Sequence, residues 1–405
     1  MSECAEISRS AGGTVLKIIV VTPAAPHPFG DTTARWFYVL ISELVARGHQ
    51  VAAFTATEEP EERLAAAEQS LKGLSGRLKL RIHRLRVDRV PLRRKWNSLL
   101  RPGSELLQDV EFTAAVRREI DEGYDVLHLE QMSTGWLGLG AARALLNIYY
   151  FDVIDWAAKK KGFGDRKALW QAQRASRRLI RGIGNVRLVT PRLKEMAESI
   201  HPGGRYWVVP VALDTSLYEM QPMIHEPVVG LIGSMHWEPS RSAAERLLTR
   251  IWPLVKRQIP ASKLYIGGWN AAKYLEKLAT GLPDVTLAQN FAHPREFFSR
   301  VAAMVYAPSR GSGMKVKIME SMAYGVPVVT TWEGVEGIEY LNGQDCWVAE
   351  SDEEIAHKTV RLLDNSAERV QMREAGRALI ESRYSRGPVV DKMMAVYEEI
   401  LSTSG

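Results

Sequence analysis

The sequence predicts two doubly wound α/β domains in tandem, facing each other across a cleft. Short, continuous apolar runs alternate with segments of helical periodicity, a pattern typical of parallel strands that helices cover on both faces. The alternation stops after residue 211, gives way at 214–227 to a segment with few apolar residues, and starts again at 228. A length of 405 residues is sufficient for two such domains, each with its own core.

The first domain begins with the apolar run 15–21, and a loop follows that ends at Gly30. Residues 33–47 show the spacing of an amphipathic helix, which Gly48 ends, and a strand is expected at 51–54. This is one βαβ unit, with its first loop at the strand edge where open α/β sheets bind ligands. Further strands are expected at 79–85, 125–129, 147–151, 186–189 and 206–211.

The second domain repeats the pattern. Strands are expected at 228–232, 263–266, 285–287, 303–306 and 346–348, and helices at 243–258, 294–301, 352–365 and 367–383. A last helix at 387–401 is expected to cross back to the first domain. We therefore predict domain limits at 1–215 and 216–385, with a C-terminal helical segment at 386–405.

The stretch 307–331 carries most information about function. Gly311 and Gly313 have no Cβ, so the loop can bring backbone N–H groups close to an anion, and the start of the following helix adds its own N–H groups and dipole. Positions 313, 317 and 320 lie on one stripe of that helix. The stripe carries Lys317 and, one turn on, Glu320, a cation for phosphates and a carboxylate for sugar hydroxyls. This pattern predicts a site for a nucleoside diphosphate.

The first residues of this helix are further candidates. The backbone amides of Met314, Lys315 and Val316 are expected to donate to the diphosphate. The Lys315 side chain is either a phosphate ligand or a solvated lysine. Glu320 has an alternative interpretation as a surface carboxylate that pairs with Lys317.

Composition excludes several classes of protein. Apolar residues make up 46% and charged residues 25%, and no long apolar run predicts a transmembrane helix. The N-terminus lacks the features of a secretory signal, and Cys4 and Cys346 form no disulfide framework, so we expect a reducing cytoplasm. The chain has neither an Asp-x-Asp motif nor a His/Cys cluster, so we expect no metal ion and no cofactor.

The net charge of +6 is concentrated in two basic segments, 77–101 and 159–181. They have two interpretations: solvated faces, or a surface that attracts anionic lipid headgroups or an anionic acceptor. Nucleic acid is disfavoured, because no binding motif accompanies the charge. The second interpretation places the protein at the inner face of a membrane as a peripheral protein.

Several segments resemble the GT-B glycosyltransferases of the large retaining family four (group 1 glycosyl transferases), which are built from two Rossmann-like domains. The resemblance extends over about 18–384 and is more specific in the second half. The matching segments are 311–331 with 334–338, 229–239, 253–268, Gly30 with Arg35, 44–51 and 125–128.

The resemblance implies transfer of a sugar from a nucleoside diphosphate sugar to an acceptor hydroxyl, with retained anomeric configuration and without a metal. The acceptor is lipid-linked or a growing saccharide, as in polysaccharide or glycolipid biosynthesis. It places Gly30, Gly233, Ser234, His236 and Phe291 near the donor, and His128 and Glu130 near the donor sugar and acceptor. The expected catalytic residues are therefore His128, Glu130, Lys317 and Glu320.

These candidates have structural alternatives. Gly30 is otherwise a turn glycine, and His128 a satisfied structural histidine. Asp152 and Asp155 either bind acceptor hydroxyls or cap a helix. Phe291 contributes its backbone to base recognition or is a core aromatic.

The chain also departs from the family pattern. The family has two glutamates eight positions apart, and counting back from Glu320 gives Ser312. The family's phosphate-binding Arg and Lys after the Gly233 turn are absent. Lys315 and Lys317 are the cations that remain to replace them.

Two further functions remain open. A GT-B nucleotide-sugar epimerase would convert a nucleotide sugar without an acceptor and release no free nucleotide. A non-catalytic nucleotide-sugar binding protein would bind the donor tightly and form no product.

Overall fold

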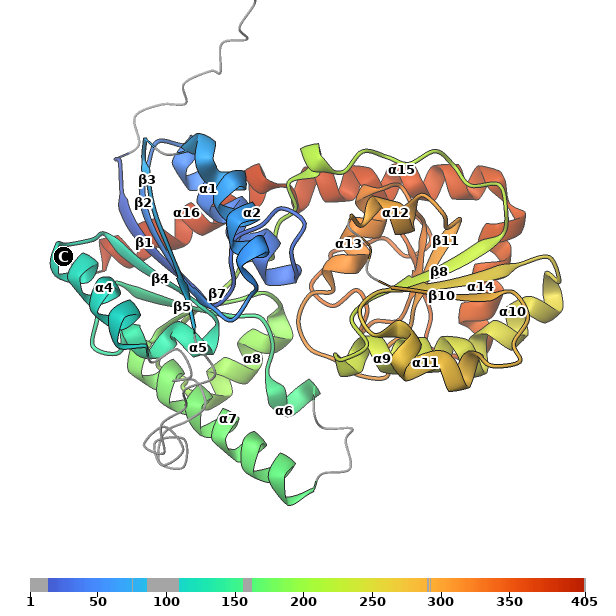
Figure 1. Cartoon of the computed structure of the whole chain (residues 1–405), viewed down its shortest axis with the longest axis horizontal. Coiled ribbons are helices and arrows are strands. Elements are labelled where there is room, and N and C mark those ends of the chain that lie inside the picture. The colour runs from blue at the N-terminus through green and yellow to red at the C-terminus, as the bar shows by residue number, and fades with distance from the viewer. Residues whose placement is uncertain are drawn as a thin grey trace, which may run out of the picture.

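The computed structural model describes residues 14–74, 76–85, 109–155, 162–289, 291 and 293–403. The chain forms two lobes that lie side by side (Figure 1). The N-terminal lobe contains β1 (Lys17–Thr22), α1 (Thr32–Ala46), β2 (Gln50–Thr57), α2 (Glu61–Leu71), β3 (Leu78–Arg84), α4 (Val110–Asp121), β4 (Val126–Glu130), α5 (Gln131–Gly135), β5 (Ala144–Ile148), α6 (Asp152–Asp155), α7 (Phe163–Ile183), β6 (Asn185–Leu188), α8 (Pro191–Ile200) and β7 (Arg205–Val208).

The C-terminal lobe is built in the same way. It contains β8 (Val228–Ile232), α9 (Glu238–Arg246), α10 (Trp252–Gln258), β9 (Lys263–Gly267), α11 (Ala271–Ala279), β10 (Val285–Ala288), α12 (Arg295–Phe298), β11 (Ala303–Tyr306), α13 (Val316–Ala323), β12 (Val328–Thr330), β13 (Trp347–Val348), α14 (Asp352–Asp364) and α15 (Ser366–Arg383), and the chain ends with α16 (Arg386–Ser402).

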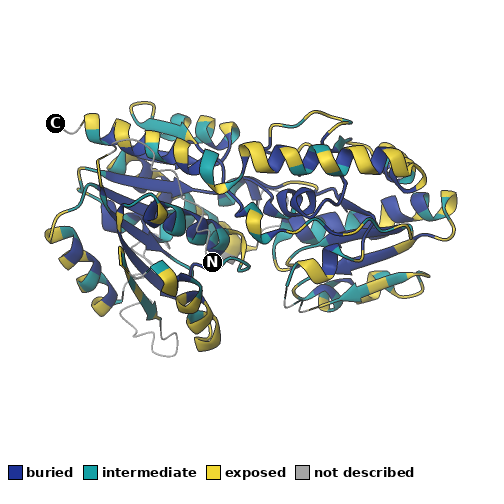
Figure 2. Cartoon of the chain, turned by 90° about the horizontal axis from the view of Figure 1, so that it is seen from above, coloured by how far each residue is buried: buried dark blue, intermediate teal, exposed yellow. Residues whose placement is uncertain are grey.

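Each lobe has one parallel sheet. Within the described residues, the N-terminal sheet has seven strands in the order β3-β2-β1-β4-β5-β6-β7, and the C-terminal sheet has six in the order β10-β9-β8-β11-β12-β13. In both sheets the order reverses direction beside the first strand, so the loops after β1 and β8 open at the strand edge that binds ligands in such folds. Both sheets are buried between helices whose outer faces are exposed (Figure 2). The predicted fold of two doubly wound domains is confirmed.

Several elements differ from the predicted bounds, among them the following three. The helix expected at 243–258 begins at Glu238, because proline is tolerated in a first helical turn and Pro239 occupies that position in α9. A π-helical segment, Leu247–Ile251, joins α9 to α10. Strand β5 begins at Ala144, three residues before the predicted start, and the helix expected at 294–301 is the single turn α12.

Helix α16 returns from the C-terminal lobe to the N-terminal lobe, where it packs against α1 and β4. Its first turns are fixed by Arg47, whose Nη1 lies 2.6 Å from Asp391 Oδ1 and whose Nη2 donates to the carbonyl of Gly387. Farther along, Tyr397 is fully buried in the N-terminal lobe. The last helix therefore connects the two lobes a second time.

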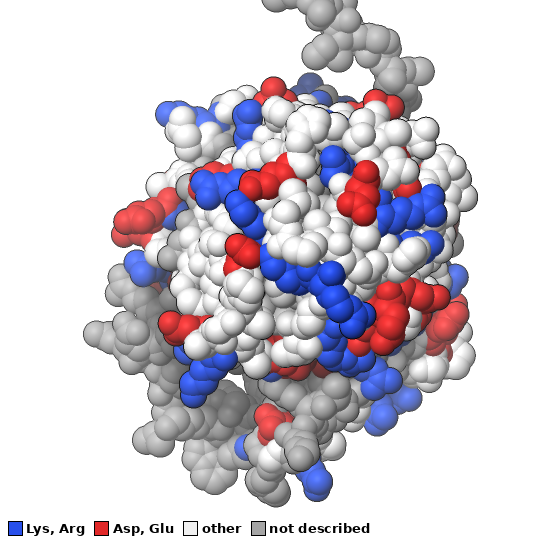
Figure 3. Space-filling model, turned by 90° about the vertical axis from the view of Figure 1, so that its right-hand side faces the viewer, with Lys and Arg blue, Asp and Glu red and all other residues white. Residues whose placement is uncertain are grey.

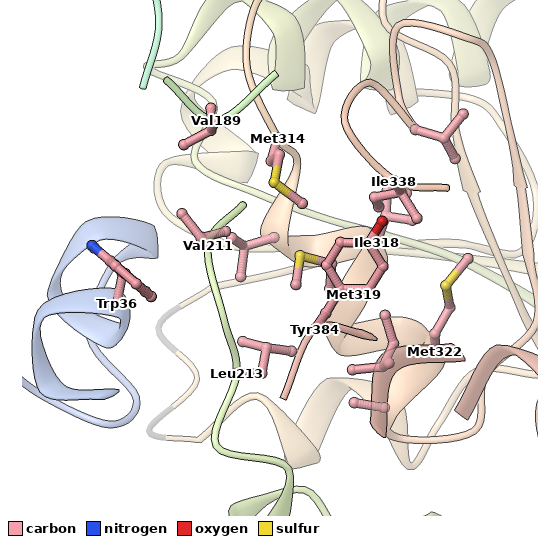
Figure 4. Packing of buried hydrophobic residues seen from close by; sticks show 14 of the residues in the cluster. Trp36, Val189, Val211, Leu213, Met314, Ile318, Met319, Met322, Ile338 and Tyr384 are labelled. Carbon is pink, nitrogen blue, oxygen red and sulfur yellow. The ribbon is translucent and has the colours of Figure 1, made fainter. Parts of the chain in front are cut away.

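The two lobes share a continuous hydrophobic core. Met314, in the loop before α13, and Met319, on α13, lie opposite Val189 and Val211 of the N-terminal lobe (Figure 4). All four side chains are buried, with exposed fractions of 8% or less. This contact sets the distance between the loops of the two lobes, and so the shape of the cleft between them.

Candidate active site

A cleft of about 320 Å³ lies between the lobes, at the carboxyl ends of both sheets. The loops after β1, β8, β9 and β10 form its walls, together with one face of α13. Its lining residues are Phe29, Asp31, Thr32, Arg35, Ile232, Gly233, Ser234, Trp237, Gly268, Trp269, Phe291, Pro294, Lys317 and Glu320. The structure thus brings together five of the residues predicted for the donor site: Gly233, Ser234, Phe291, Lys317 and Glu320.

Glu320 is held by the opposite lobe. Its Oε2 lies 2.6 Å from Nη1 of Arg35 on α1, and the hydroxyl of Tyr218 donates to its Oε1 at 3.4 Å. Both charged side chains are largely buried, with exposed fractions of 14% for Arg35 and 6% for Glu320. The alternative in which Glu320 pairs with Lys317 is therefore wrong, and Arg35, which was not among the predicted site residues, belongs to the cleft.

Lys317 occupies a pocket of aromatic rings. Its Nζ donates to the hydroxyl of Ser240, and lies 4.5 Å from the ring centre of Tyr306 and 5.1 Å from that of Trp237. Burial, with repulsion from Lys315, lowers the pKa of Lys317 to about 7. A diphosphate beside this amine would favour its charged form.

We therefore expect a diphosphate to raise the pKa of Lys317 when it binds. Above pH 7 the free protein holds this lysine mostly neutral, so binding of a nucleoside diphosphate takes up a proton, and affinity falls as pH rises. Calorimetry of UDP binding in buffers of different ionisation enthalpy measures this uptake. Lys317→Arg, which stays charged, should bind UDP without taking up a proton. Equal proton uptake by both proteins would contradict the assignment of Lys317 to the diphosphate.

Lys315 lies elsewhere. Its side chain is 1% exposed, and its Nζ donates to the carbonyl of Gly313 at 2.5 Å and lies 3.9 Å from Glu336 Oε2. Burial lowers the pKa of Lys315. The interpretation as a solvated lysine is wrong, and the ammonium group is directed into the interface between the lobes instead of the cleft. Because Met314 and Val316 also have buried side chains, only their backbone can serve a ligand.

The glycine loop 311–313 contacts the N-terminal lobe. The backbone N–H and the hydroxyl of Ser312 both donate to Oδ1 of Asp155 at 2.7 Å, and the N–H of Phe151 donates to the same hydroxyl at 3.2 Å. Burial raises the pKa of Asp155. Gly311 accepts a hydrogen bond through its carbonyl from Arg192 at 3.3 Å. Ser312, at the position of the missing glutamate, thus binds a carboxylate from the other lobe.

Gly313 allows the lobes to approach. It has a φ of +74°, and a Cβ built on it would lie 1.9 Å from the carbonyl oxygen of Tyr149. Gly313→Ala is therefore expected to separate the lobes and lower the donor affinity, besides the roughly 1–2 kcal/mol that a left-handed conformation costs alanine. Small-angle scattering and UDP titration measure both effects.

Gly281→Ala is the matched control, since Gly281 has a φ of +80° and open space around it. It carries the same backbone cost without the collision. If both variants keep the scattering profile of the wild type, the close approach at Gly313 does not set the distance between the lobes.

His128 and Glu130 are not in the cleft, and the expectation that they approach the donor sugar and acceptor requires correction. Both have an exposed fraction of 0%, and His128 Nε2 lies 2.7 Å from Glu130 Oε1. The indole N–H of Trp36 donates to the same oxygen at 2.9 Å, and the Tyr149 hydroxyl donates to the other carboxylate oxygen. They end β4 beneath α1, so their carboxylate and imidazole stay inside the core.

This buried network extends to α16. The Tyr397 hydroxyl lies 2.7 Å from His128 Nδ1, and Arg187 donates to the Tyr149 hydroxyl at 3.2 Å. Burial alone would raise the pKa of Glu130, but His128 and Arg187 outweigh it and lower the pKa. The network joins β4, β5, β6 and α16, so its role in this structure is to stabilise the fold.

The remaining predicted residues lie around the cleft. Gly30 is in the loop between Phe29 and Asp31, where a Cβ would lie 2.7 Å from that of Ala34. His236 is exposed and its ring packs against Tyr274, so the expectation that it faces the cleft is wrong. Its neighbour Trp237 takes that place.

Sequence reasoning missed Trp237, Ser240 and Trp269. Trp269 follows β9, lines the cleft and is 56% exposed, an unusual exposure for tryptophan. A tryptophan directly after a Gly-Gly strand end was the available signal. The sequence carried no signal for Ser240, because only the fold places its hydroxyl against Lys317.

Among the described residues, no group of three or more His, Cys, Asp or Glu side chains is arranged to hold a metal ion. In the same residues, every helix is too short or too polar to cross a membrane.

Two models of glycosyltransferase domains match the chain. Residues 33–212 match the model of the glycosyl transferase 4-like domain, and residues 226–365 match that of the group 1 glycosyl transferases. No curated protein sequence matches the chain.

Solved structures similar to this one have the same two-lobed fold. Sucrose-phosphate synthase from Thermosynechococcus elongatus superposes with a TM-score of 0.71 at 15% identity, covering 96% of this chain and 100% of that chain. HepE of Anabaena, in complex with UDP and glucose, gives 0.67 at 14% identity over 96% and 100%. TarM gives 0.68 at 11% identity over 95% and 99%. The expected GT-B fold is confirmed, and the fold, the cleft and the two matched domain models together support a glycosyltransferase.

Proposed function

We propose that this chain transfers a sugar from a nucleoside diphosphate sugar to an acceptor hydroxyl, with retention of anomeric configuration. The observation that carries the proposal is the cleft in which α13 presents Lys317 and Glu320 beside the turns after β8 and β9. The donor occupies the C-terminal lobe, 216–385, and the acceptor approaches from the N-terminal lobe, 1–215.

The cleft supports one arrangement of the donor. Lys317 takes the diphosphate, because it is the cation of the cleft that belongs to the C-terminal lobe. Glu320, one turn along α13, accepts hydrogen bonds from the ribose hydroxyls. Trp269 and Phe291 flank the far end of the cleft, where their rings and backbone can hold a base.

Arg35 changes partner in this proposal. In the structure described here it neutralises Glu320 across the cleft. A bound ribose replaces it at the carboxylate, and the guanidinium group is then free to pair with the diphosphate. Together with Lys317, it stabilises the negative charge that develops on the leaving diphosphate, so the reaction needs no metal ion.

The arrangement favours transfer over epimerisation. A nucleotide-sugar epimerase needs acid and base groups at the sugar ring. The carboxylates among the cleft-lining residues are Asp31, which caps α1 through the N–H groups of Thr33 and Ala34, and Glu320, which is paired with Arg35. Asp31 is held by the helix, and Glu320 is held by Arg35 or, in the donor complex, by the ribose, so neither is available as a free base.

Thermal unfolding with a panel of nucleotide sugars tests the donor class. HepE structures are complexes with UDP and glucose or with UDP-glucose, so uridine nucleotides are the first probes. A ligand at 100 times its dissociation constant stabilises the fold by about 2.7 kcal/mol. Stabilisation by a nucleotide sugar, followed by release of the diphosphate only with an acceptor and in the presence of EDTA, supports the proposal. Product with inverted configuration by NMR contradicts retention, and conversion without an acceptor contradicts transfer.

A further inference from the structure

Helix α7 carries a basic face that the transfer reaction does not use. Arg166, Trp170, Arg174, Arg177 and Arg181 follow one another at steps of three or four residues, so they form one stripe along the helix. All five are exposed, and they define what we call the α7 stripe. Lys167 and Arg178 flank the stripe, and Asp165 is the single acid of the helix.

The opposite face of α7 holds the helix to the lobe. Ala175, Ser176, Leu179 and Ile180 are buried there, and the helix packs against β5, β6 and α8. At 21 residues, α7 is about 30 Å long. It runs along the lower border of the N-terminal lobe, and its first turns project beyond the neighbouring helices (Figure 1). The stripe is therefore a long, rigid, outward-facing surface.

Two features separate the α7 stripe from an ordinary solvated face. Among the described residues, Arg166, Arg174 and Arg177 have no carboxylate partner. By contrast, several bases on the end of the C-terminal lobe have acids beside them, where blue and red atoms lie next to one another (Figure 3). The second feature is Trp170, which is 54% exposed in the middle of the stripe, with the Arg174 guanidinium 5.4 Å from its ring centre.

We propose that the α7 stripe docks on an anionic phospholipid surface. Arginine pairs with lipid phosphates, and tryptophan places its apolar ring at the level of the headgroups with its N–H in contact with water. A row of cations with one indole on a straight helix fits such a flat surface. Base edges in the groove of a duplex would instead require protruding side chains of varied hydrogen-bonding type.

Helix α7 is connected to the interface between the lobes. Helix α6 packs against α7, and its Asp155 binds Ser312 at the interface between the lobes. A membrane held at α7 would therefore lie close to the opening between the lobes. This would present a membrane-borne acceptor to the N-terminal lobe, an extension that rests on the proposed function.

Vesicle co-sedimentation of the full chain tests the proposal. Vesicles of phosphatidylcholine with phosphatidylglycerol should bind the protein, vesicles of phosphatidylcholine alone should bind it far less, and high salt should weaken the binding. Each cation near such a surface accounts for roughly a fivefold change in affinity, so Arg174→Glu with Arg177→Glu should lower binding by at least about 25-fold. Trp170→Ala should lower it roughly tenfold.

Matched variants on the other lobe make the test specific. Arg257→Glu with Lys277→Glu changes the net charge equally at exposed positions of α10 and α11, and Trp332→Ala removes a tryptophan that is 48% exposed. These controls should bind vesicles within about twofold of the wild type, because none of the three residues belongs to α7. UDP affinity, measured on every variant, separates this test from that of the proposed function.

Three outcomes would overturn the assignment. Equal binding to both vesicle types would show that the charge is not used, and equal loss in the stripe variants and the controls would show a general charge effect. Binding of duplex DNA that the stripe variants abolish, without binding to anionic vesicles, would assign the face to nucleic acid.

Discussion

Lys317→Ala is expected to lower kcat for sugar transfer by roughly 10²–10³-fold, the effect of removing one group that stabilises charge in a transition state. The lysine is the cation on the donor side of the cleft, and Ser240 and two aromatic rings fix its position. Initial rates of UDP release at saturating donor and acceptor measure the loss. In the free variant the ion pair of Arg35 with Glu320 stays intact, so the lobes should remain together before the donor binds.

Glu320→Gln and Lys277→Ala complete this experiment. Glu320→Gln should chiefly weaken donor binding, because the amide is uncharged and has one accepting oxygen where the carboxylate has two. Lys277→Ala removes an exposed lysine from the same lobe and should leave kcat unchanged. If Lys317→Ala transferred sugar at the wild-type rate, the diphosphate would not bind at α13.

Glu130→Ala is expected to destabilise the fold by about 3–5 kcal/mol, the cost of removing one partner from a buried charged network. His128, Trp36 and Tyr149 would each lose a hydrogen-bond partner in a site without water access. Since native domains are stable by about 5–15 kcal/mol, this loss is a large share of the total. Denaturant unfolding of the variant and the wild type measures it.

Two further variants separate the network from a general effect of mutation. Tyr397→Phe removes only the hydroxyl that contacts His128 and should cost about 1 kcal/mol. Glu398→Ala changes an exposed residue on the same helix and should stay within about 0.5 kcal/mol. A Glu130→Ala protein as stable as Glu398→Ala would show that the network does not hold the fold.

The same network has a defined pH dependence. The pKa of Glu130 in the folded protein lies below its ordinary value, so the unfolded chain binds the proton more readily. The carboxylate therefore stabilises the fold above the ordinary glutamate pKa, and this contribution is lost as pH falls through the folded-state pKa. In Glu130→Gln, the free energy of unfolding should therefore fall less steeply as the pH is lowered than it does in the wild type.

The fold was predictable because its signals are local. The apolar run before Thr22 and the one at 228–232 have the length and flanking turns of parallel strands, and both form the predicted strands. The glycine loop and Lys317 with Glu320 on one helical stripe also follow from spacing along one segment, and both side chains line the cleft. The strands, the loop and the helical stripe each depend on one segment of the chain, so the sequence of that segment predicts them.

The partners of these residues were not predictable, because they come from distant segments. Arg35 is separated from Glu320 by most of the chain, and neither helix carries a signal for the other. His128 and Glu130 end a strand, as expected, but α1 and the returning α16 cover them, which no property of β4 indicates. The burial of Lys315 was not predictable either, because it depends on Glu336 and on the other lobe.

A crystal structure of the chain with UDP would show where the diphosphate binds. We expect a diphosphate oxygen within ion-pair distance of Lys317 Nζ, the ribose hydroxyls on Glu320, and Arg35 released from that carboxylate. A structure in which UDP binds outside the cleft, while Arg35 and Glu320 keep their contact of 2.6 Å, would contradict this expectation.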